Sequence, residues 1–174
     1  DVPGTDIGGA SWGTEGIIVF SWGAGWSVRG GGGLFEVPDA GGASALLVKA
    51  NEGEIGFTSP LVLPNRAGVL AVVNYNDRTW KVVRISKDGL REPVLDIQGS
   101  AQIAYSPSGD LLYGLGTGGL WAVPLRLSPL GITGKSVRVT EEGSAPSVTA
   151  DGRLVYMPKL LSALRFVWVN QRCQ

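Results

Sequence analysis

The stretch Ser106-Pro107-Ser108-Gly109-Asp110-Leu111-Leu112-Tyr113 decides the fold, because versions of it recur along the chain. In each version a turn containing a glycine leads into a short apolar strand. The other three versions lie at residues 12–20, 65–72 and 149–156, and their glycines (Gly16, Gly68, Gly109 and Gly152) are 52, 41 and 43 residues apart. A period of this size with several strands per unit predicts the blades of a β-propeller.

Short apolar runs separated by turn residues make up the rest of the chain. Thirteen of them read as strands: residues 17–20, 34–37, 45–48, 61–63, 69–73, 82–85, 94–97, 103–105, 111–115, 120–123, 137–140, 154–157 and 166–169. One segment, 159–165, is a possible helix but is too short to stand alone, and an irregular hairpin loop is an equal alternative for it. The pattern predicts an all-β fold of four-stranded antiparallel blades.

The repeats divide a single domain into units at about 8–53, 54–99, 100–143 and 144–174. An open array of such units leaves two apolar sheet faces uncovered, and such faces attract partners. Three arrangements are open: four units close into a small ring, the chain is part of a larger propeller, or copies associate through their open blade edges. Homo-oligomers are therefore an expected partner state.

Charge and composition restrict the function classes. Fifteen basic and fifteen acidic residues cancel, so we expect no nucleic-acid partner. No run of 18 apolar residues predicts a membrane span. The first residues show no signal peptide, although a mature secreted protein can begin this way. The compartment stays open between cytoplasm and periplasm or exterior, and the lone Cys173 does not decide it.

The chain has no histidine, which removes Ser-His-Asp and Cys-His nucleophile systems and the usual zinc sites. We expect no catalytic residue and no cofactor, with Ca²⁺ as the one ion that carboxylates could hold. Glu52 and Glu54 stand two apart and could hold Ca²⁺ or act as acid and base, but a solvated turn around Gly53 is the preferred interpretation.

Other patterns also have structural interpretations. Glu141 and Glu142 are expected in a solvated turn, and Asp110 and Asp151 are expected to cap turns. Residues 114–119 match G-x-G-x-x-G, but a strand rather than a helix follows, so a glycine-rich hairpin is expected. The run of glycines at 30–33 predicts a flexible hairpin loop.

The tryptophans supply the candidate ligand site. Trp22, Trp26 and Arg29 lie on a glycine-flanked insertion, where two indoles could stack on a sugar or peptide and the guanidinium could bind a carboxylate. Packing against a neighbouring blade or a second copy is the alternative. The remaining tryptophans, Trp12, Trp80, Trp121 and Trp168, recur at matching places and are expected to pack between blades.

At residues 120–127 (Leu-Trp-Ala-Val-Pro-Leu-Arg-Leu) and 131–139 (Gly-Ile-Thr-Gly-Lys-Ser-Val-Arg-Val) the chain resembles the WD-like, TolB-like propeller repeats found C-terminal to many bacterial serine/threonine protein kinases. Residues 9–13, 16–20 and 33–42 look like another such repeat, and residues 152–156 and 167–170 like a further one. The resemblance covers nearly the whole chain, although residues 74–77 fit least well. It implies a propeller that binds a ligand or protein rather than a catalyst.

The kinase motifs His-Arg-Asp and Asp-Phe-Gly are absent from the sequence, and Gln171-Arg172-Cys173-Gln174 replaces the usual continuation. We therefore expect a non-catalytic binding module for a protein, peptide or small molecule, related to or cut from a larger bacterial sensor-kinase propeller. A truncated gene or a metagenomic reading frame would explain the departures.

Two alternatives to this module remain. One is a hydrolase or lactonase with a Ca²⁺ site at the propeller mouth, built from Asn74, Asn76, Asp77 and Asp110. The other is a non-catalytic propeller detached from a larger enzyme, which would be a kinase or a prolyl-peptidase-like hydrolase.

Overall fold

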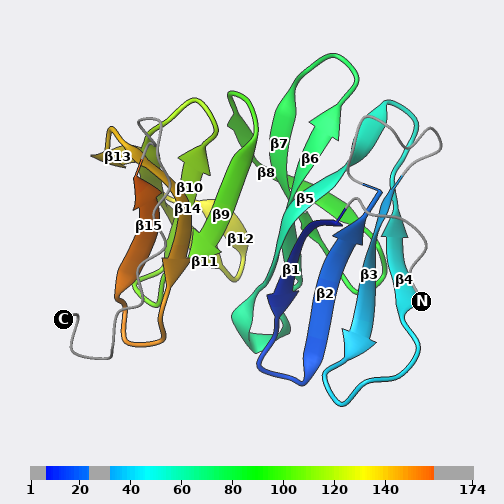
Figure 1. Ribbon diagram of the computed structural model, residues 1–174. Helices are drawn as coiled ribbons and strands as arrows, with labels where there is room; N and C mark the ends of the chain where they lie inside the picture. Colours follow the sequence, from blue (N-terminus) through cyan, green and yellow to red (C-terminus); the bar gives the residue numbers. More distant parts are fainter. Residues whose placement is uncertain (1–6, 24–31, 159–174) are drawn as a thin grey trace.

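The computed structural model describes residues 7–23 and 32–158. The chain forms antiparallel sheets that follow one another in sequence order and stand side by side in an arc (Figure 1). Each strand is hydrogen-bonded mainly to the strand before or after it, as expected when short loops connect neighbours.

The first two sheets have four strands each, in the orders β1-β2-β3-β4 and β5-β6-β7-β8. The first consists of β1 (Ile7–Trp12), β2 (Ile17–Trp22), β3 (Gly33–Pro38) and β4 (Ala45–Lys49). The second consists of β5 (Glu54–Val62), β6 (Val69–Tyr75), β7 (Trp80–Ile85) and β8 (Arg91–Ile97), with the 3-10 turn η1 (Pro64–Arg66) between β5 and β6.

The third sheet has the order β9-β10-β11, with both β13 and the short β12 paired to β11. Its strands are β9 (Ala101–Tyr105), β10 (Asp110–Leu115), β11 (Leu120–Leu127), β12 (Leu130–Ile132) and β13 (Val137–Thr140). The fourth sheet, as far as it is described, pairs β14 (Gly143–Val148) with β15 (Leu154–Pro158).

The first strand of each sheet lies at the inner side of the arc. β1 contacts β5, β5 contacts β9, and β9 contacts β14, so these four strands line a common axis. The sheets approach closely here: a Cβ on Gly114 would lie 2.8 Å from the Cα of Ser144, so only glycine fits. Sheets arranged radially about an axis, with the first strand innermost, have propeller geometry.

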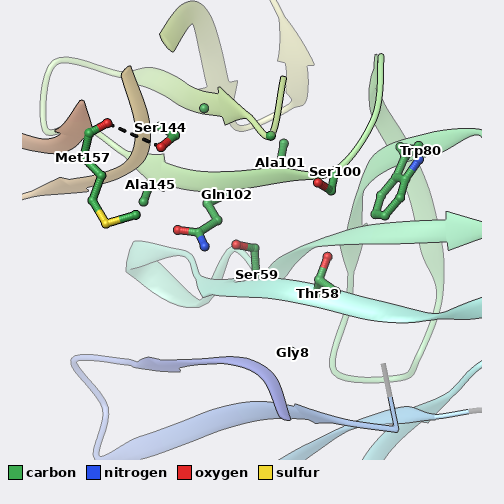
Figure 2. A pocket seen from close by; sticks show the side chains of 12 residues that line it. Gly8, Thr58, Ser59, Trp80, Ser100, Ala101, Gln102, Ser144, Ala145 and Met157 are labelled. Atoms are coloured by element: carbon green, nitrogen blue, oxygen red, sulfur yellow. Dashed lines mark hydrogen bonds between the residues drawn. The ribbon is translucent and has the colours of Figure 1, made fainter. Parts of the chain in front are cut away.

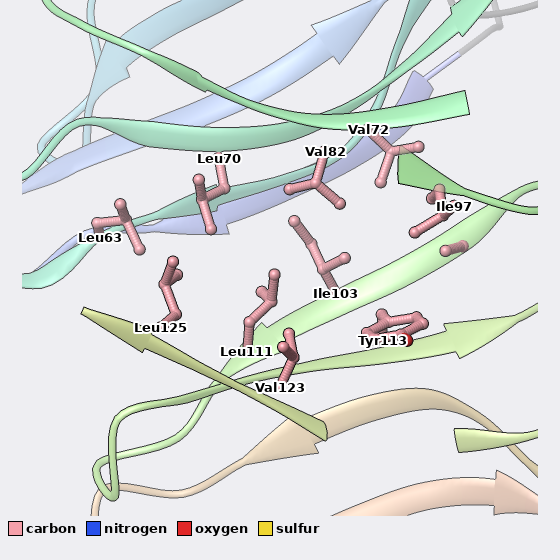
Figure 3. Close-up of a cluster of buried hydrophobic side chains, with 11 residues drawn as sticks. Leu63, Leu70, Val72, Val82, Ile97, Ile103, Leu111, Tyr113, Val123 and Leu125 are labelled. Atoms are coloured by element: carbon pink, nitrogen blue, oxygen red, sulfur yellow. The ribbon is translucent and has the colours of Figure 1, made fainter. Parts of the chain in front are cut away.

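Apolar side chains fill the space between consecutive sheets. The largest core lies between the second and third sheets (Figure 3) and consists of Leu63, Leu70, Val72, Val82, Ile97, Ala101, Ile103, Leu111, Tyr113, Val123 and Leu125. Val19, Leu34, Phe57, Val69, Ala71, Val73, Val83 and Ile85 form the core between the first and second sheets. Ala104, Leu112 and Leu120 pack with Val148 and Leu154 between the third and fourth.

The structure corrects the expectation for one tryptophan. Trp80 and Trp121 pack against the core between the second and third sheets, as predicted. Trp12 instead is 68% exposed and only donates a hydrogen bond from Nε1 to Asp39, at 3.3 Å. Among the described residues, the other sheet that its strand contacts is the second one, which lies on the opposite face. Trp168 and the helical segment 159–165 lie outside the described residues.

The expected solvated turn around Gly53 is confirmed for Glu52, which is exposed in a turn, but the expectation is wrong for Glu54. Glu54 begins β5, and its side chain is 5% exposed and lies 3.1 Å from Nη1 of Arg91. The Asn51 amide donates to the same carboxylate at 2.8 Å, and the Arg91 guanidinium stacks over the Phe57 ring. Burial, and then the Glu54 charge, raises the pKa of Tyr75. The Glu54 carboxylate, which was expected to be hydrated, thus forms a buried ion pair with Arg91.

The other turn predictions are confirmed. Asp110 accepts a hydrogen bond from Ser108 at 2.7 Å, and Asp151 accepts one from Thr149 and lies 3.1 Å from Arg153. Glu141 pairs with Arg138 in an exposed turn, and Glu142 is exposed. The glycine-rich segment 114–119 forms the hairpin between β10 and β11. Of residues 30–33, Gly33 begins β3, while 30 and 31 lie outside the described residues.

Candidate functional site

A cavity of about 310 Å³ lies where all four sheets converge (Figure 2). It is lined by Gly8, Thr58, Ser59, Trp80, Ser100, Ala101, Gln102, Gly114, Gly116, Ser144, Ala145 and Met157. Gly8 comes from β1, Thr58 and Ser59 from β5, Gln102 from β9 and Ser144 from β14. A cavity at the convergence of many elements is a default candidate for a binding site.

The inner strands are distorted where they line this cavity. The registers of β1, β5 and β14 each shift near the cavity, at Ile7/Gly9, Thr58/Leu61 and Ser144/Ser147. Gly9, Ser59 and Ala145 have φ values of 134°, 49° and 48°. Pro60 and Pro146 follow two of them and need no ladder partner for an N–H. Bulges of this kind re-aim side chains next to functional sites.

The polar side chains in the cavity are hydroxyls and one carboxamide. Thr58 donates to the carbonyl of Val72 at 3.5 Å and Ser144 to that of Met157 at 3.4 Å. Gln102 is exposed, and Figure 2 shows its amide and the Ser59 hydroxyl directed toward one another. A carboxamide can both donate and accept hydrogen bonds, so this cavity offers both functions to a ligand.

The described lining contains no ionisable side chain. Trp80 supplies an aromatic wall at one end, and the glycines and Ala101 leave the middle open. A neutral lining of this kind suits a ligand that forms hydrogen bonds without carrying a strong charge.

A larger crevice, of about 560 Å³, lies between the first and second sheets. Its lining includes the apolar residues Val19, Val62 and Ile85 together with five charged residues, Glu15, Glu36, Arg84, Lys87 and Asp88. It is formed by two sheets alone, and Val19 and Ile85 belong to the core between them. We regard the cavity at the convergence of all four sheets as the better candidate.

The sequence-predicted ligand site is described only in part. Trp22 ends β2 and packs edge-to-face on Phe35, with ring centroids 6.1 Å apart. It does not line the central cavity. Trp26 and Arg29 lie outside the described residues, so a joint site of these three remains a prediction.

The candidate calcium ligands occupy two different turns. Asn76 and Asp77 lie in the turn between β6 and β7, next to the buried Asn74 at the end of β6. Asp110 follows the turn between β9 and β10. These two kinds of turn lie at opposite ends of the sheets, because consecutive antiparallel strands reverse direction. The structure therefore does not bring the four residues together.

The surroundings of Asp77 and Asn74 bear on whether either residue binds a metal ion. Hydrogen bonds from the side chain and backbone of Thr79 lower the pKa of Asp77. Within the described part of the chain, the Asn74 Oδ1 atom is buried without a hydrogen-bond partner, and no three His, Cys, Asp or Glu side chains form a possible metal cluster.

Sequence reasoning missed the cavity residues of β1 and β14 because these two segments did not read as strands. Their residues are small and polar, Ile-Gly-Gly-Ala-Ser-Trp and Gly-Ser-Ala-Pro-Ser-Val. A signal was present: Thr58-Ser59-Pro60 and Ser144-Ala145-Pro146 share a hydroxyl, a small residue and a proline shortly before the unit glycines Gly68 and Gly152. Short polar motifs at a fixed place in each repeat mark one common surface.

Helices long and apolar enough to cross a membrane do not occur in the described part of the chain. Comparison with known proteins finds no matching family model and no matching curated protein. Among solved structures, the chain is similar to regucalcin from Agrobacterium tumefaciens, which is described as a calcium-binding protein.

The similarity to regucalcin has a TM-score of 0.60 at 15% sequence identity and covers 86% of this chain and 52% of that one. The chain thus spans about half the length of the solved structure that it matches. Identity this low shows the fold alone, and the fold is that of a partial, all-β propeller.

Proposed function

We propose that the protein is a non-catalytic binding module whose ligand occupies the central cavity. The observation that carries this proposal is the convergence of four sheets on one cavity lined by neutral hydrogen-bonding groups. The ligand class that fits is a small neutral polar molecule or a short uncharged peptide segment, because charged ligands gain no ion pair from this lining. Gln102 would be the main recognition residue, with Trp80 as an apolar wall.

Regucalcin's description as a calcium-binding protein supports the alternative, a calcium-dependent hydrolase or lactonase. Calcium takes six to eight oxygen ligands, usually with several carboxylates among them. The described lining offers hydroxyl, carboxamide and backbone carbonyl oxygens. These residues do not fit a calcium site by themselves, so the binding module is the better supported of the two functions.

The narrower parts of the proposal rest on the sequence. A WD-like, TolB-like repeat type and an origin in a sensor-kinase propeller follow from the resemblance at residues 120–139. A propeller used for recognition agrees with a neutral cavity at its axis. Sequencing the surrounding gene would decide the kinase context.

Ligand screening tests the binding proposal. A thermal-shift panel of neutral polyols, neutral tripeptides, charged tripeptides and CaCl₂ would identify stabilising compounds, because a ligand that binds the folded state raises Tm. For a neutral hit, we expect Gln102→Ala to weaken the Kd about 3- to 10-fold, the equivalent of one hydrogen bond of roughly 1 kcal/mol.

Gln98→Ala is the matched control, because Gln98 is also exposed but does not line the central cavity. Equal effects of the two substitutions would contradict the assigned site. Stabilisation by CaCl₂ alone would favour the hydrolase.

A further inference from the structure

The two faces of the first sheet differ in what covers them. Val19 and Leu34 face the second sheet and are 2% and 0% exposed. Each described strand outside the first sheet that makes extended contact with it belongs to the second sheet, namely β5. The opposite face of the first sheet, the outward face, has no described sheet on it.

The outward face is apolar and rich in aromatic rings. Cross-strand pairing places Phe20 opposite Phe35 and Phe35 opposite Leu46 on this face, and Trp12 lies there opposite Ile18. Phe20 and Phe35 stack with ring centroids 5.6 Å apart. Trp12 and Leu46 remain 68% and 54% exposed. A contiguous exposed patch of this composition marks an interaction surface.

The sequence of β2 is that of a strand buried on both faces. Residues 17–20 are Ile-Ile-Val-Phe, without the polar alternation of a strand that has one solvent-facing side. The second sheet has an equally continuous run in β6, where Val69 to Val73 are all buried because sheets cover both faces. By this comparison, β2 is built for a second neighbour.

The fourth sheet has the complementary free face. Leu154 packs toward the third sheet, so the next residue on the strand, Val155, points away from it. Val155 is 64% exposed. Apart from its partner β14, β15 makes extended contact with no described strand. The arc thus ends in an aromatic face on the first sheet and, on the described part of the fourth sheet, in a face where exposed Val155 lies opposite Ser147.

We propose that a second copy of this chain covers both ends, with the outward face of the first sheet of each copy packed on the fourth sheet of the other. Consecutive sheets within the chain already pack in this order, so the contact continues an existing type of interface. The arc corresponds to 52% of the regucalcin chain, so two arcs supply about one complete propeller. Two identical contacts related by a two-fold axis give a closed dimer.

The proposed dimer would also change the surroundings of the central cavity. The dimer itself does not depend on the proposed binding function. β1 and β14 line the cavity and are the inner strands at the two ends of the arc. In the closed dimer the inner strands of both copies surround one axis, so the cavity is bordered by two copies.

Light scattering over a range of concentrations tests the dimer. The expected mass is twice 18.2 kDa. Leu46→Glu places a charge in the proposed interface and should raise the dimer Kd at least tenfold. Leu90→Glu is the matched control, because Leu90 is 70% exposed and lies between β7 and β8, away from both ends. A mass of 18.2 kDa at all concentrations would overturn the proposal and would point to further sheets of a longer polypeptide as the cover.

A mixing experiment tests the head-to-tail geometry. Val155→Glu alone should also give monomers, because each contact uses both ends. Mixing Leu46→Glu with Val155→Glu should restore partial dimerisation, since the mixed dimer keeps one contact with neither substitution. A Val155→Glu variant that dimerises like the unmodified chain would exclude this geometry and indicate pairing of two first sheets. A cooperative unfolding transition in each variant, compared with the unmodified chain at a concentration at which that chain is monomeric, would show that both variants fold.

Discussion

The second sheet and the first sheet have similar strands but different surroundings. In the second sheet, Leu70 and Val72 face the third sheet while Ala71 and Val73 face the first, and all four are 0% exposed. In the first sheet, Val19 faces the second sheet and is 2% exposed, while Ile18 and Phe20 on the outward face of the same strand are only partly buried. The strands β2 in the first sheet and β6 in the second both begin with a continuous apolar sequence.

This difference shows that burial in a radial array is decided by neighbouring sheets more than by the strand itself. The apolar pattern of a strand indicates how many of its faces are covered in the native structure. The side chains of β2 are less buried than its continuous apolar sequence predicts. This difference indicates that a further neighbour covers the outward face of the first sheet. Substitutions on the two sheets can test how far the contrast holds.

The largest expected effect is at Leu70 in the second sheet. Leu70→Ala should lower the free energy of unfolding by about 4 kcal/mol, because a fully buried leucine loses both its transfer energy and its packing partners. Leu46→Ala on the outward face should change the stability of the monomer by less than about 0.5 kcal/mol. Urea unfolding of both variants at low protein concentration measures the two values. Similar losses would mean that the outward face is already packed within the monomer.

A smaller effect is expected for the pair of tryptophans. Trp121 stacks on Tyr113, with ring centroids 6.4 Å apart, and Arg138 lies 4.8 Å from its ring. Trp121→Ala should cost about 2 kcal/mol, less than the roughly 3–5 kcal/mol of a fully buried tryptophan, because the ring is only partly buried. Trp12→Ala should cost almost nothing in the monomer.

Equilibrium unfolding followed by circular dichroism avoids a readout that depends on the tryptophans themselves. A loss below about 1 kcal/mol for Trp121→Ala would contradict its place in the core. A loss for Trp12→Ala that appears only at high protein concentration would instead sharpen the contrast, because the ring would then be covered by a second copy.

The repeat of turn glycines predicted the propeller because turns and alternating apolar strands are local properties. Glycine is needed at Gly109 and Gly152, where φ is 91° and 82°, and this need is visible in the sequence. The inner strands β1 and β14 were missed because crowding at the axis selects small residues there, which carry no strand signal.

The candidate site was predicted less well than the fold. The sequence directed attention to the tryptophans of one loop, whereas the central cavity is assembled from Thr58, Gln102 and Ser144, which lie about one unit apart in the chain. None of these residue types signals chemistry by itself. Only their common place at the axis makes them a candidate surface, and that place follows from the packing of the sheets. The burial of Glu54 was missed for the same reason, since its partner Arg91 is 37 residues away.

The smallest expected effect concerns the exposed end of the second sheet, where contacts should change a pKa without affecting the packed interior. Thr79 donates two hydrogen bonds to the Asp77 carboxylate, at 2.7 and 2.9 Å, and they lower the pKa of Asp77 below 3.8. A lowered pKa in the folded state gives a contribution to stability that is present above pH 3.8 and is lost as the pH falls through the folded-state value.

Thr79→Ala should therefore raise the pKa of Asp77 toward its ordinary value and cause a small loss of stability at neutral pH, where the contribution of the two hydrogen bonds is fully present. NMR titration of the side-chain carboxyl measures the shift, and Thr117→Ala, at an exposed threonine in the turn between β10 and β11, is the control that should leave Asp77 unaltered. An unchanged pKa in Thr79→Ala would show that the turn is solvated rather than held by these bonds. A large loss of stability at neutral pH would show that the end of the second sheet is coupled to its interior, which would break the contrast between covered and uncovered surfaces.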